Sequence, residues 1–301
     1  MARIRVAHLG ALLVTTSASC AAVLGIDDPS IEGRIFLDDA SIDRRAAEET
    51  SFDASVDATA LDDGGDSGVN PVTMDDAGCP TGRGASMAAY RGVAGNGDFC
   101  IDRTEVTLAQ WSTFKSQAID PATQGADCTW NTSFPAGSGT AAGYPVVSVN
   151  WCDAKAFCAW AGKRLCGALG GGPCSPGSSI LSTSGQWAYA CTNRGATSFP
   201  YGASFQQDAC NITHDAGAPA QVGASPLCSN QNGVLDLSGN VWEWVDDRMP
   251  VDAGSSPGDL GYFLGGEFSS PGTYDCAVAG GYRIDFRDAR VGFRCCADFP
   301  K

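Results

Sequence analysis

Fourteen cysteines in 301 residues constrain the fold of this chain more than any other feature. No two of them are spaced as C-x-x-C, and the chain has only His8 and His214 as histidines, so zinc-ribbon, zinc-finger and haem-attachment sites are disfavoured. Proteins of a reducing compartment rarely carry thiols in such numbers, whereas exported domains use them as disulfides. The sequence therefore predicts an exported domain held together by disulfide bonds.

Residues 1–20 have the pattern of a secretory signal. Arg3 and Arg5 precede the apolar run LGALLV at residues 9–14, which is too short to span a bilayer as a permanent helix. The small residues SAS and then Cys20 resemble a bacterial lipobox, in which the cysteine is lipidated and becomes the mature N-terminus. Ordinary cleavage just before Cys20 is the alternative. If Cys20 is lipidated, thirteen cysteines remain, so one thiol is free or paired with another chain.

Residues 21–78 are predicted to be a disordered acidic linker. Fifteen of the 34 acidic residues lie between residues 27 and 78, against three arginines, so most of the net charge of −15 belongs to this segment. Its few aromatic residues and missing periodicity leave too little apolar surface to offset the entropy of ordering. The spaced aspartates of residues 53–66 lack the spacing and final glutamate of a calcium loop. No basic stripe appears, which disfavours nucleic acid binding.

Residues 79–301 are predicted to form one α+β domain with few helices, short strands and long loops. Three capping pairs indicate helix starts, namely Thr107 with Gln110, Asn150 with Asp153, and Thr183 with Gln186. Gly162 is expected to end the second helix. The β-prone runs are FCIDRTEVT (99–107), YPVVSVNW (144–151) and VGFRCC (291–296). Disulfides are expected to supply stability that regular structure does not.

The segment LDLSGNVWEW (235–244) combines two tryptophans with acidic side chains. Trp242 and Trp244 can each bury a large apolar surface. Asp236 and Glu243 offer oxygens that a hard cation could use. The alternative is a tight turn that only feeds aromatic side chains into a core.

Seven blocks follow one another in an order that resembles a known family. They are FCIDRTEVTLAQW (99–111), YPVVSVNWCDAKAFCAWAGKRL (144–165), QWAYAC (186–191), FPYG (199–202), GNVWEW (239–244), LGGEF (264–268) and GFRC (292–295). They look like the signature blocks of the formylglycine-generating enzyme, or sulfatase-modifying-factor, family, over about residues 80–298. The resemblance implies a disulfide-rich C-type-lectin-like variant fold. Well-known members oxidise a sulfatase cysteine to formylglycine with O₂ and copper, and another branch makes sulfoxides with a histidine-bound non-haem iron.

The resemblance also implies calcium sites and disulfides. A first calcium site maps to Asp236, Gly239, Val241 and Glu243, and a second maps to Asn211 and Ile212, although its loop looks shortened here. The implied disulfides are Cys158–Cys295 and Cys191–Cys276. Cys166 and Cys174 bracket a glycine-rich insertion and are expected to pair locally.

The sequence departs from the family at the expected copper site. Active members carry a serine after the paired glycines and then two redox cysteines, whereas this chain reads EFSSPGTYDC after Gly266. Glu267 stands in the serine position, and Ser269 and Ser270 lie where the first thiol is expected. A serine hydroxyl cannot replace a soft thiolate on copper(I), and Cys276 is assigned to the structural bridge. The iron branch needs several imidazoles, and His214 is the only histidine after the signal.

We therefore expect a lipid-anchored protein of the bacterial cell envelope, periplasmic or on the outer surface, that contacts the membrane only through its anchor. Its domain is expected to be a calcium-stabilised binding module for an unknown protein or small molecule. A formylglycine-generating oxidase with a relocated thiol pair, such as Cys276 and Cys296, is the alternative, and only it requires copper. Another oxygen-dependent enzyme is a further alternative. A paired-carboxylate hydrolase built on Glu105, Glu243 or Glu267 also stays open.

Overall fold

The computed structural model describes residues 35–37, 72–93, 97–212, 217–251, 256–269 and 272–299. The predicted signal, Cys20, His214, Ser270 and most of the predicted linker lie outside these residues. None of the helices among the described residues is long and apolar enough to cross a membrane.

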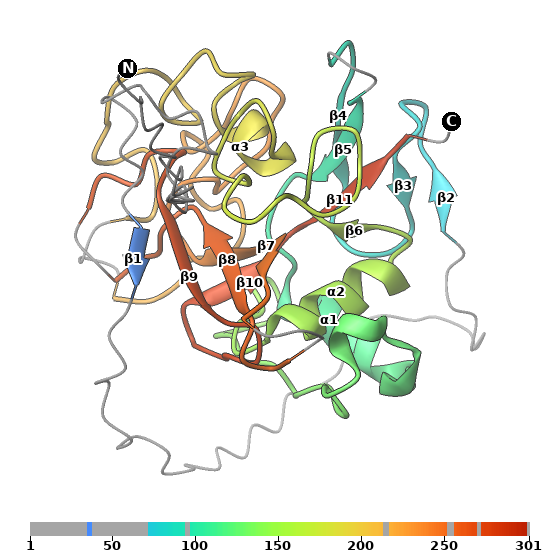
Figure 1. Ribbon diagram of the computed structural model, residues 1–301. Coiled ribbons are helices and arrows are strands. Elements are labelled where there is room, and N and C mark those ends of the chain that lie inside the picture. The colour runs from blue at the N-terminus through green and yellow to red at the C-terminus, as the bar shows by residue number, and fades with distance from the viewer. Residues whose placement is uncertain are drawn as a thin grey trace, which may run out of the picture. The chain divides into compact units, whose positions relative to one another are not determined.

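One of the two larger sheets is a five-stranded mixed sheet (Figure 1). Its order is β1 (Ile35–Leu37), β9 (Ala279–Arg283), β8 (Leu260–Leu264), β7 (Trp242–Met249) and β10 (Val291–Phe293). The three central strands are antiparallel, whereas β10 runs parallel to β7 and β1 parallel to β9. The run WEW therefore begins a central strand, and the loop before it lies at the edge where β7 starts.

A second, antiparallel sheet has four strands, and a two-stranded hairpin is hydrogen-bonded separately from it. The order is β4 (Met87–Tyr90), β5 (Phe99–Asp102), β11 (Cys295–Asp298) and β6 (Arg164–Leu165). The hairpin joins β2 (Thr73–Met74) to β3 (Pro80–Thr81). Only Arg294 separates β10 from β11, so the chain passes from one sheet to the other at this residue.

Two of the three helix starts follow the predicted capping chemistry. Thr107 caps α1 (Leu108–Ser116) and Asn150 caps α2 (Trp151–Trp160), each as a complete capping box, and Gly162 follows the end of α2 with φ of 72°. The third prediction was wrong. Gly185, not Thr183, precedes α3 (Gln186–Cys191), and the side chain of Gln186 accepts a hydrogen bond from the amide of Gly167 instead of closing a capping box.

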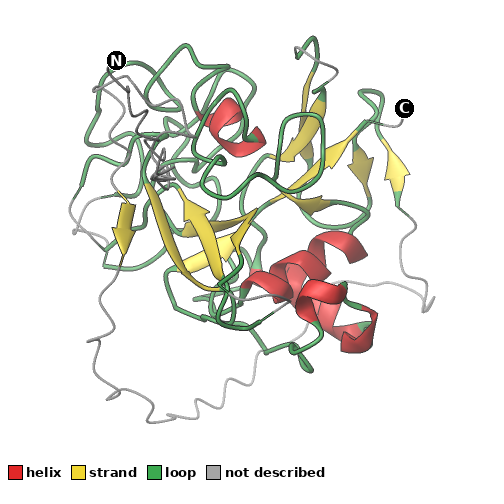
Figure 2. Ribbon diagram, viewed as in Figure 1, coloured by secondary structure: helices red, strands yellow, loops and turns green. Residues whose placement is uncertain are grey.

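The predicted strand at residues 144–151 was also wrong. This segment makes only isolated bridges, at Pro145 and Val147. Ser148 has φ of 59°, a left-handed conformation that interrupts an extended strand, and α2 begins at Trp151. The other two runs contain β5, β10 and the start of β11. Loops account for much of the remaining chain (Figure 2).

Six disulfides cross-link these loops and strands. Cys158 is bonded to Cys295 and Cys191 to Cys276, the pairs that the resemblance implied. The expected Cys166–Cys174 pair was wrong, because β6 pairs with β11 and brings Cys166 to Cys296. Cys174 is instead free and buried, and its backbone amide donates to the carbonyl of Asp246. The remaining pairs are Cys79–Cys100, Cys128–Cys152 and Cys210–Cys228.

Candidate functional site

The loop before β7 brings together the two segments to which calcium ligands were assigned. Asp236, Gly239 and Asn240 all have left-handed backbone conformations, with φ of 59°, 80° and 59°. A Cβ on Gly239 would lie 2.2 Å from Cγ2 of Ile212 and 2.5 Å from the carbonyl oxygen of Asn211, so only glycine fits there. The amide of Asn240 donates to that same Asn211 carbonyl at 2.9 Å. The loop is therefore fixed directly against residues 211–212.

Glu243 forms a buried ion pair with Arg294. Its two carboxylate oxygens accept hydrogen bonds from Nε and Nη2 of Arg294, both at 2.6 Å, and Oε2 also accepts from the indole of Trp187 at 2.8 Å. Glu243 and Arg294 are 1% and 0% exposed. Burial alone lowers the pKa of Arg294, but the charge and hydrogen bonds of Glu243 raise it above its ordinary value. Glu243 is thus the bidentate counter-ion of a buried guanidinium.

Two further buried carboxyls, Glu105 and Asp236, lie beside this ion pair. Oε1 of Glu105 accepts from Nδ2 of Asn240 at 2.7 Å, and Oδ2 of Asp236 accepts from the amide of Gly223 at 2.6 Å. Oε2 of Glu105 finds no donor among the described residues. Burial and then the charge of Asp236 raise the pKa of Glu105 well above its ordinary value, and burial likewise raises the pKa of Asp236. The charge of each carboxyl therefore affects the protonation of the other, so the two groups titrate as a pair.

Charge decides which of these groups fits a cation. Three buried carboxyls surround one guanidinium, so a proton or a cation is needed to neutralise the excess negative charge. Glu243 does not fit as a calcium ligand in this arrangement, because Arg294 occupies both of its oxygens. Asp236 and the unpartnered oxygen of Glu105 do fit, since calcium prefers carboxylate oxygens. Within the described ranges, no group of three or more His, Cys, Asp or Glu side chains is arranged to hold a metal ion.

The remaining residues of the predicted calcium sites have structural contacts. Val241 is fully buried just before β7, and the amide of Gly239 donates to the carbonyl of Gly265 at 2.7 Å. The side-chain amide of Asn211 donates to Oδ1 of Asn240 at 3.1 Å. Residues 213–216, which follow Ile212, lie outside the described residues.

The loop after β8 contains the position where family members carry their redox chemistry. Gly265 and Gly266 have φ of 101° and 79°, and a Cβ on Gly266 would lie 2.2 Å from Cγ of Tyr274. Glu267 is fully buried, and its Oε2 accepts from the amide of Ser269 at 2.5 Å. Its Oε1 has no partner among the residues that the structure describes. A carboxylate thus occupies the position of the family serine.

The cysteines considered for a relocated copper site are bonded elsewhere. Cys276 is bonded to Cys191 and Cys296 to Cys166, so the suggested pairing of Cys276 with Cys296 was wrong. Cys174 is the only cysteine among the described residues without a disulfide. Burial, and then the charge of Asp247, raises the pKa of its thiol to about 12, which leaves almost no thiolate at neutral pH.

These features define a disulfide-rich α+β domain whose loops are fixed by buried polar groups. Residues 71–299 match the family model of the sulfatase-modifying factor enzyme 1-like domain. The chain therefore belongs to the sulfatase-modifying-factor family. Its mixed sheet, few helices and six disulfides among the described residues agree with the fold that the resemblance implied.

Curated relatives include both a named enzyme and a protein named as inactive. The formylglycine-generating enzyme of Mus musculus is 30% identical over an alignment of 183 residues that covers 52% of this chain and 44% of that protein. Inactive C-alpha-formylglycine-generating enzyme 2 of Bos taurus is 34% identical over an alignment of 133 residues that covers 38% of each chain. The chain thus spans about half or less of the length of these relatives. The solved structure of CarF matches 67% of this chain and 87% of its own, with a TM-score of 0.48 and 19% identity.

Sequence reasoning missed the basic partner at the centre of this site. Arg294 lies in the block GFRC, which the sequence analysis used only for its cysteine. The signal was available, because a buried glutamate needs a partner of opposite charge and Arg294 lies within the predicted β-prone run VGFRCC. Glu105 was noted only as one of three unselected carboxylates, since 131 residues separate it from Asp236 in the sequence.

Proposed function

We propose that this chain is a binding module that keeps the family scaffold without the copper-thiolate oxidase chemistry. The observation that carries the proposal is the Cys191–Cys276 disulfide, both of whose cysteines are 1% exposed or less. This disulfide leaves Cys276, the cysteine that follows the Gly265–Gly266 loop, without a free thiol. In the same loop, Glu267 replaces the family serine. A relative named as inactive is compatible with a scaffold that persists without this activity. The partner is a protein or a small molecule.

An aldehyde assay tests this proposal. The whole purified chain is incubated with copper(I), oxygen and a peptide that contains the sulfatase motif Cys-x-Pro-x-Arg, and aldehyde is trapped with a hydrazine. An active formylglycine-generating enzyme is the parallel control. We expect the peptide cysteine to stay unchanged. Aldehyde formation that disappears in the double variant Cys191→Ala/Cys276→Ala would support the oxidase instead.

We further propose that calcium binds at Asp236 and Glu105, with Glu243 serving as the counter-ion of Arg294. The unpartnered Oε2 of Glu105 supports this assignment. Calcium would neutralise the excess negative charge and join the loop before β7 to the segment between β5 and α1 that carries Glu105. A ligand at 100 times its Kd stabilises a protein by about 2.7 kcal/mol. We expect calcium to raise the melting temperature of the parent chain above its value in chelator.

Two variants separate calcium binding from a general effect of charge. Asp236→Asn should abolish the calcium-dependent rise, whereas Asp285→Asn should keep it, because Asp285 lies in an exposed ion pair with Arg283. If the parent chain has the same melting curve with calcium and with chelator, calcium does not bind at Asp236 and Glu105.

We propose that Cys20 is lipidated and anchors the chain at the bacterial cell envelope. Cysteine parity supports this assignment, since twelve of the other thirteen cysteines are paired and Cys174 is buried. Metabolic labelling with a fatty acid analogue should mark the parent chain but not Cys20→Ser. Equal labelling of both would contradict the anchor.

A further inference from the structure

A cavity of about 330 Å³ lies beside α2, with the Cys128–Cys152 disulfide in its wall. Its lining comes from α2, from the 3-10 helix Ala126–Cys128 and from the segment around Ile119. Trp160 and Ala156 make one side apolar. The cavity is of the size that small ligands or single side chains occupy. Both half-cystines line it, although Cys128 and Cys152 are only 2% and 0% exposed to bulk water.

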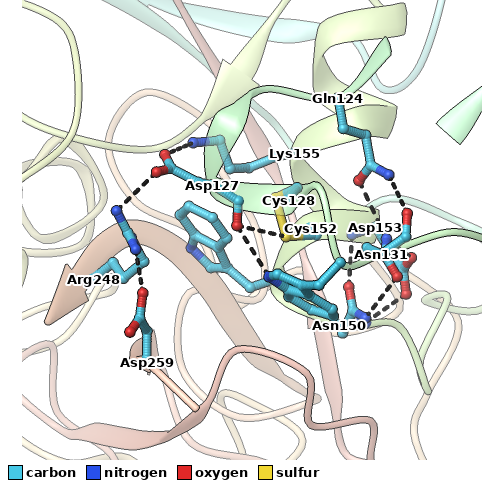
Figure 3. Close-up of a disulfide and its surroundings, with 12 residues drawn as sticks. Gln124, Asp127, Cys128, Asn131, Asn150, Cys152, Asp153, Lys155, Arg248 and Asp259 are labelled. Carbon is cyan, nitrogen blue, oxygen red and sulfur yellow. Dashed lines mark hydrogen bonds and ion pairs between the residues drawn. A yellow bond between two sulfur atoms is a disulfide. The ribbon is translucent and has the colours of Figure 1, made fainter. Parts of the chain in front are cut away.

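The two sulfurs have different electrostatic surroundings. Cys152 is the second residue of α2, where the partial positive charge of a helix N-terminus stabilises a thiolate. Lys155 lies one turn further along the same helix and lines the same cavity (Figure 3). Its Nζ lies 4.2 Å from the ring centre of Trp151 and is in ion pairs with Asp246 at 3.5 Å and Asp127 at 3.8 Å. Cys128 instead ends a short 3-10 helix.

Neighbouring contacts hold this arrangement in place. Asp127 also accepts from Arg248 at 2.9 Å, and Arg248 is paired with Asp259 (Figure 3). On the other side, Asn131 donates to Asp153 at 2.8 Å, which fixes the loop after Cys128 to the first turn of α2. Opening the disulfide would therefore leave both segments held by other bonds.

We propose that Cys128–Cys152 is a thiol-exchange site, at which a thiolate entering the cavity attacks Sγ of Cys128 and displaces the thiolate of Cys152. The thiolate is either a low-molecular-weight thiol or an unpaired cysteine side chain of a partner protein. This site is separate from the loops before β7 and after β8, so it does not depend on the proposed binding function.

The exchange step is balanced without an added oxidant or reductant. The incoming sulfur forms a new S–S bond with Sγ of Cys128, and the old S–S bond breaks with its electron pair going to Sγ of Cys152. The incoming thiol loses its proton to solvent beforehand. Cys152 is the better leaving group, because a thiol of lower pKa leaves faster. Return attack by the Cys152 thiolate releases the thiol and restores the disulfide.

Two other disulfides provide matched comparisons. Cys79–Cys100 closes a loop of similar length, with a sequence separation of 21 against 24, and both of its cysteines are fully buried. Cys210–Cys228 has the most exposed half-cystine of the three pairs, since Cys210 is 6% exposed. Surface exposure alone would therefore open Cys210–Cys228 first, whereas the proposal requires Cys128–Cys152 to react first.

The test treats the whole folded chain with glutathione in one arm and with a short peptide containing one cysteine in the other. Remaining thiols are blocked with N-ethylmaleimide, and peptides are mapped by mass spectrometry. We expect the first adduct on Cys128, with the blocking group on Cys152, before any other disulfide opens. A faster peptide arm identifies a protein thiol as the better substrate, and a faster glutathione arm identifies a small thiol.

Variants of Lys155 separate thiolate stabilisation from local unfolding. Lys155→Ala should slow the exchange, because loss of the ammonium charge makes the Cys152 thiolate a poorer leaving group, whereas Lys155→Arg should retain the parent rate. Three results would overturn the proposal. They are earlier opening of another disulfide, a first adduct on Cys152, and exchange that occurs only in denaturant at the rate of global unfolding.

Discussion

Replacing either member of the buried Glu243–Arg294 pair should destabilise the domain, and by unequal amounts. Removing one partner of a buried ion pair costs about 3–5 kcal/mol, because the other charge is left uncompensated. In Glu243→Gln, Arg294 still has Glu105 and Asp236 nearby as negative charges, so we expect about 3 kcal/mol. In Arg294→Met, three buried carboxyls lose their only guanidinium, so we expect about 5 kcal/mol.

Urea unfolding of the oxidised chain measures both values, provided that the m-values stay equal. The double variant should be less destabilised than the sum of the two, because the residues contact each other. The exposed pair Arg283–Asp285 is the control, and its removal should change stability by less than about 1 kcal/mol. A Glu243→Gln variant as unstable as Arg294→Met, or a strictly additive double variant, would refute this reading of the charges.

Three further predictions concern buried groups. Because burial raises the folded-state pKa of Glu105 above its unfolded value near 4.5, the parent loses stability as pH rises from that value through the folded pKa. In the presence of chelator, Glu105→Gln should therefore be the more stable form at pH 7, with the difference shrinking toward pH 4.5; a constant difference in urea titrations would contradict this. Replacing Cys158 and Cys295 together by alanine opens a loop of sequence separation 137 and should cost about 5 kcal/mol in the same titrations, and a cost below about 1 kcal/mol would refute the entropic argument. Cys174 should react with a chromogenic disulfide reagent only after unfolding, and fast labelling of the folded chain would contradict its burial.

Short-range sequence patterns correctly predicted the parts of the fold that depend on contacts between residues close in the sequence. The capping boxes at Thr107 and Asn150 are closed by residues three positions away, so sequence spacing was sufficient. The predicted cap at Thr183 does not form, because the side chain of Gln186 is hydrogen-bonded to residues far from it in the sequence. It accepts from the amide of Gly167 and donates to Asp298. The strand predicted at residues 144–151 does not form, because β-propensity does not reveal that the backbone of Ser148 adopts a left-handed conformation.

Long-range pairing limited what could be predicted of the disulfides and the site. Cys158–Cys295 and Cys191–Cys276 came from the family resemblance, not from spacing. Cys166 was assigned to its near neighbour Cys174, whereas strand pairing between β6 and β11 brings it to Cys296. Likewise, the approach of Glu105 to Asp236 depends on the folded arrangement of distant segments, so sequence alone gave the carboxyls but not their pairing.

A disulfide map of the oxidised chain tests most directly whether copper chemistry has a place on this scaffold. Free thiols are blocked under denaturing conditions, the chain is cleaved without reduction, and linked peptides are identified by mass spectrometry. We expect a peptide that joins Cys191 to Cys276, with no blocking group on either residue. A blocked Cys276, or a peptide that joins it to Cys296, would show that a thiol is available for copper and would refute the proposed loss of oxidase chemistry.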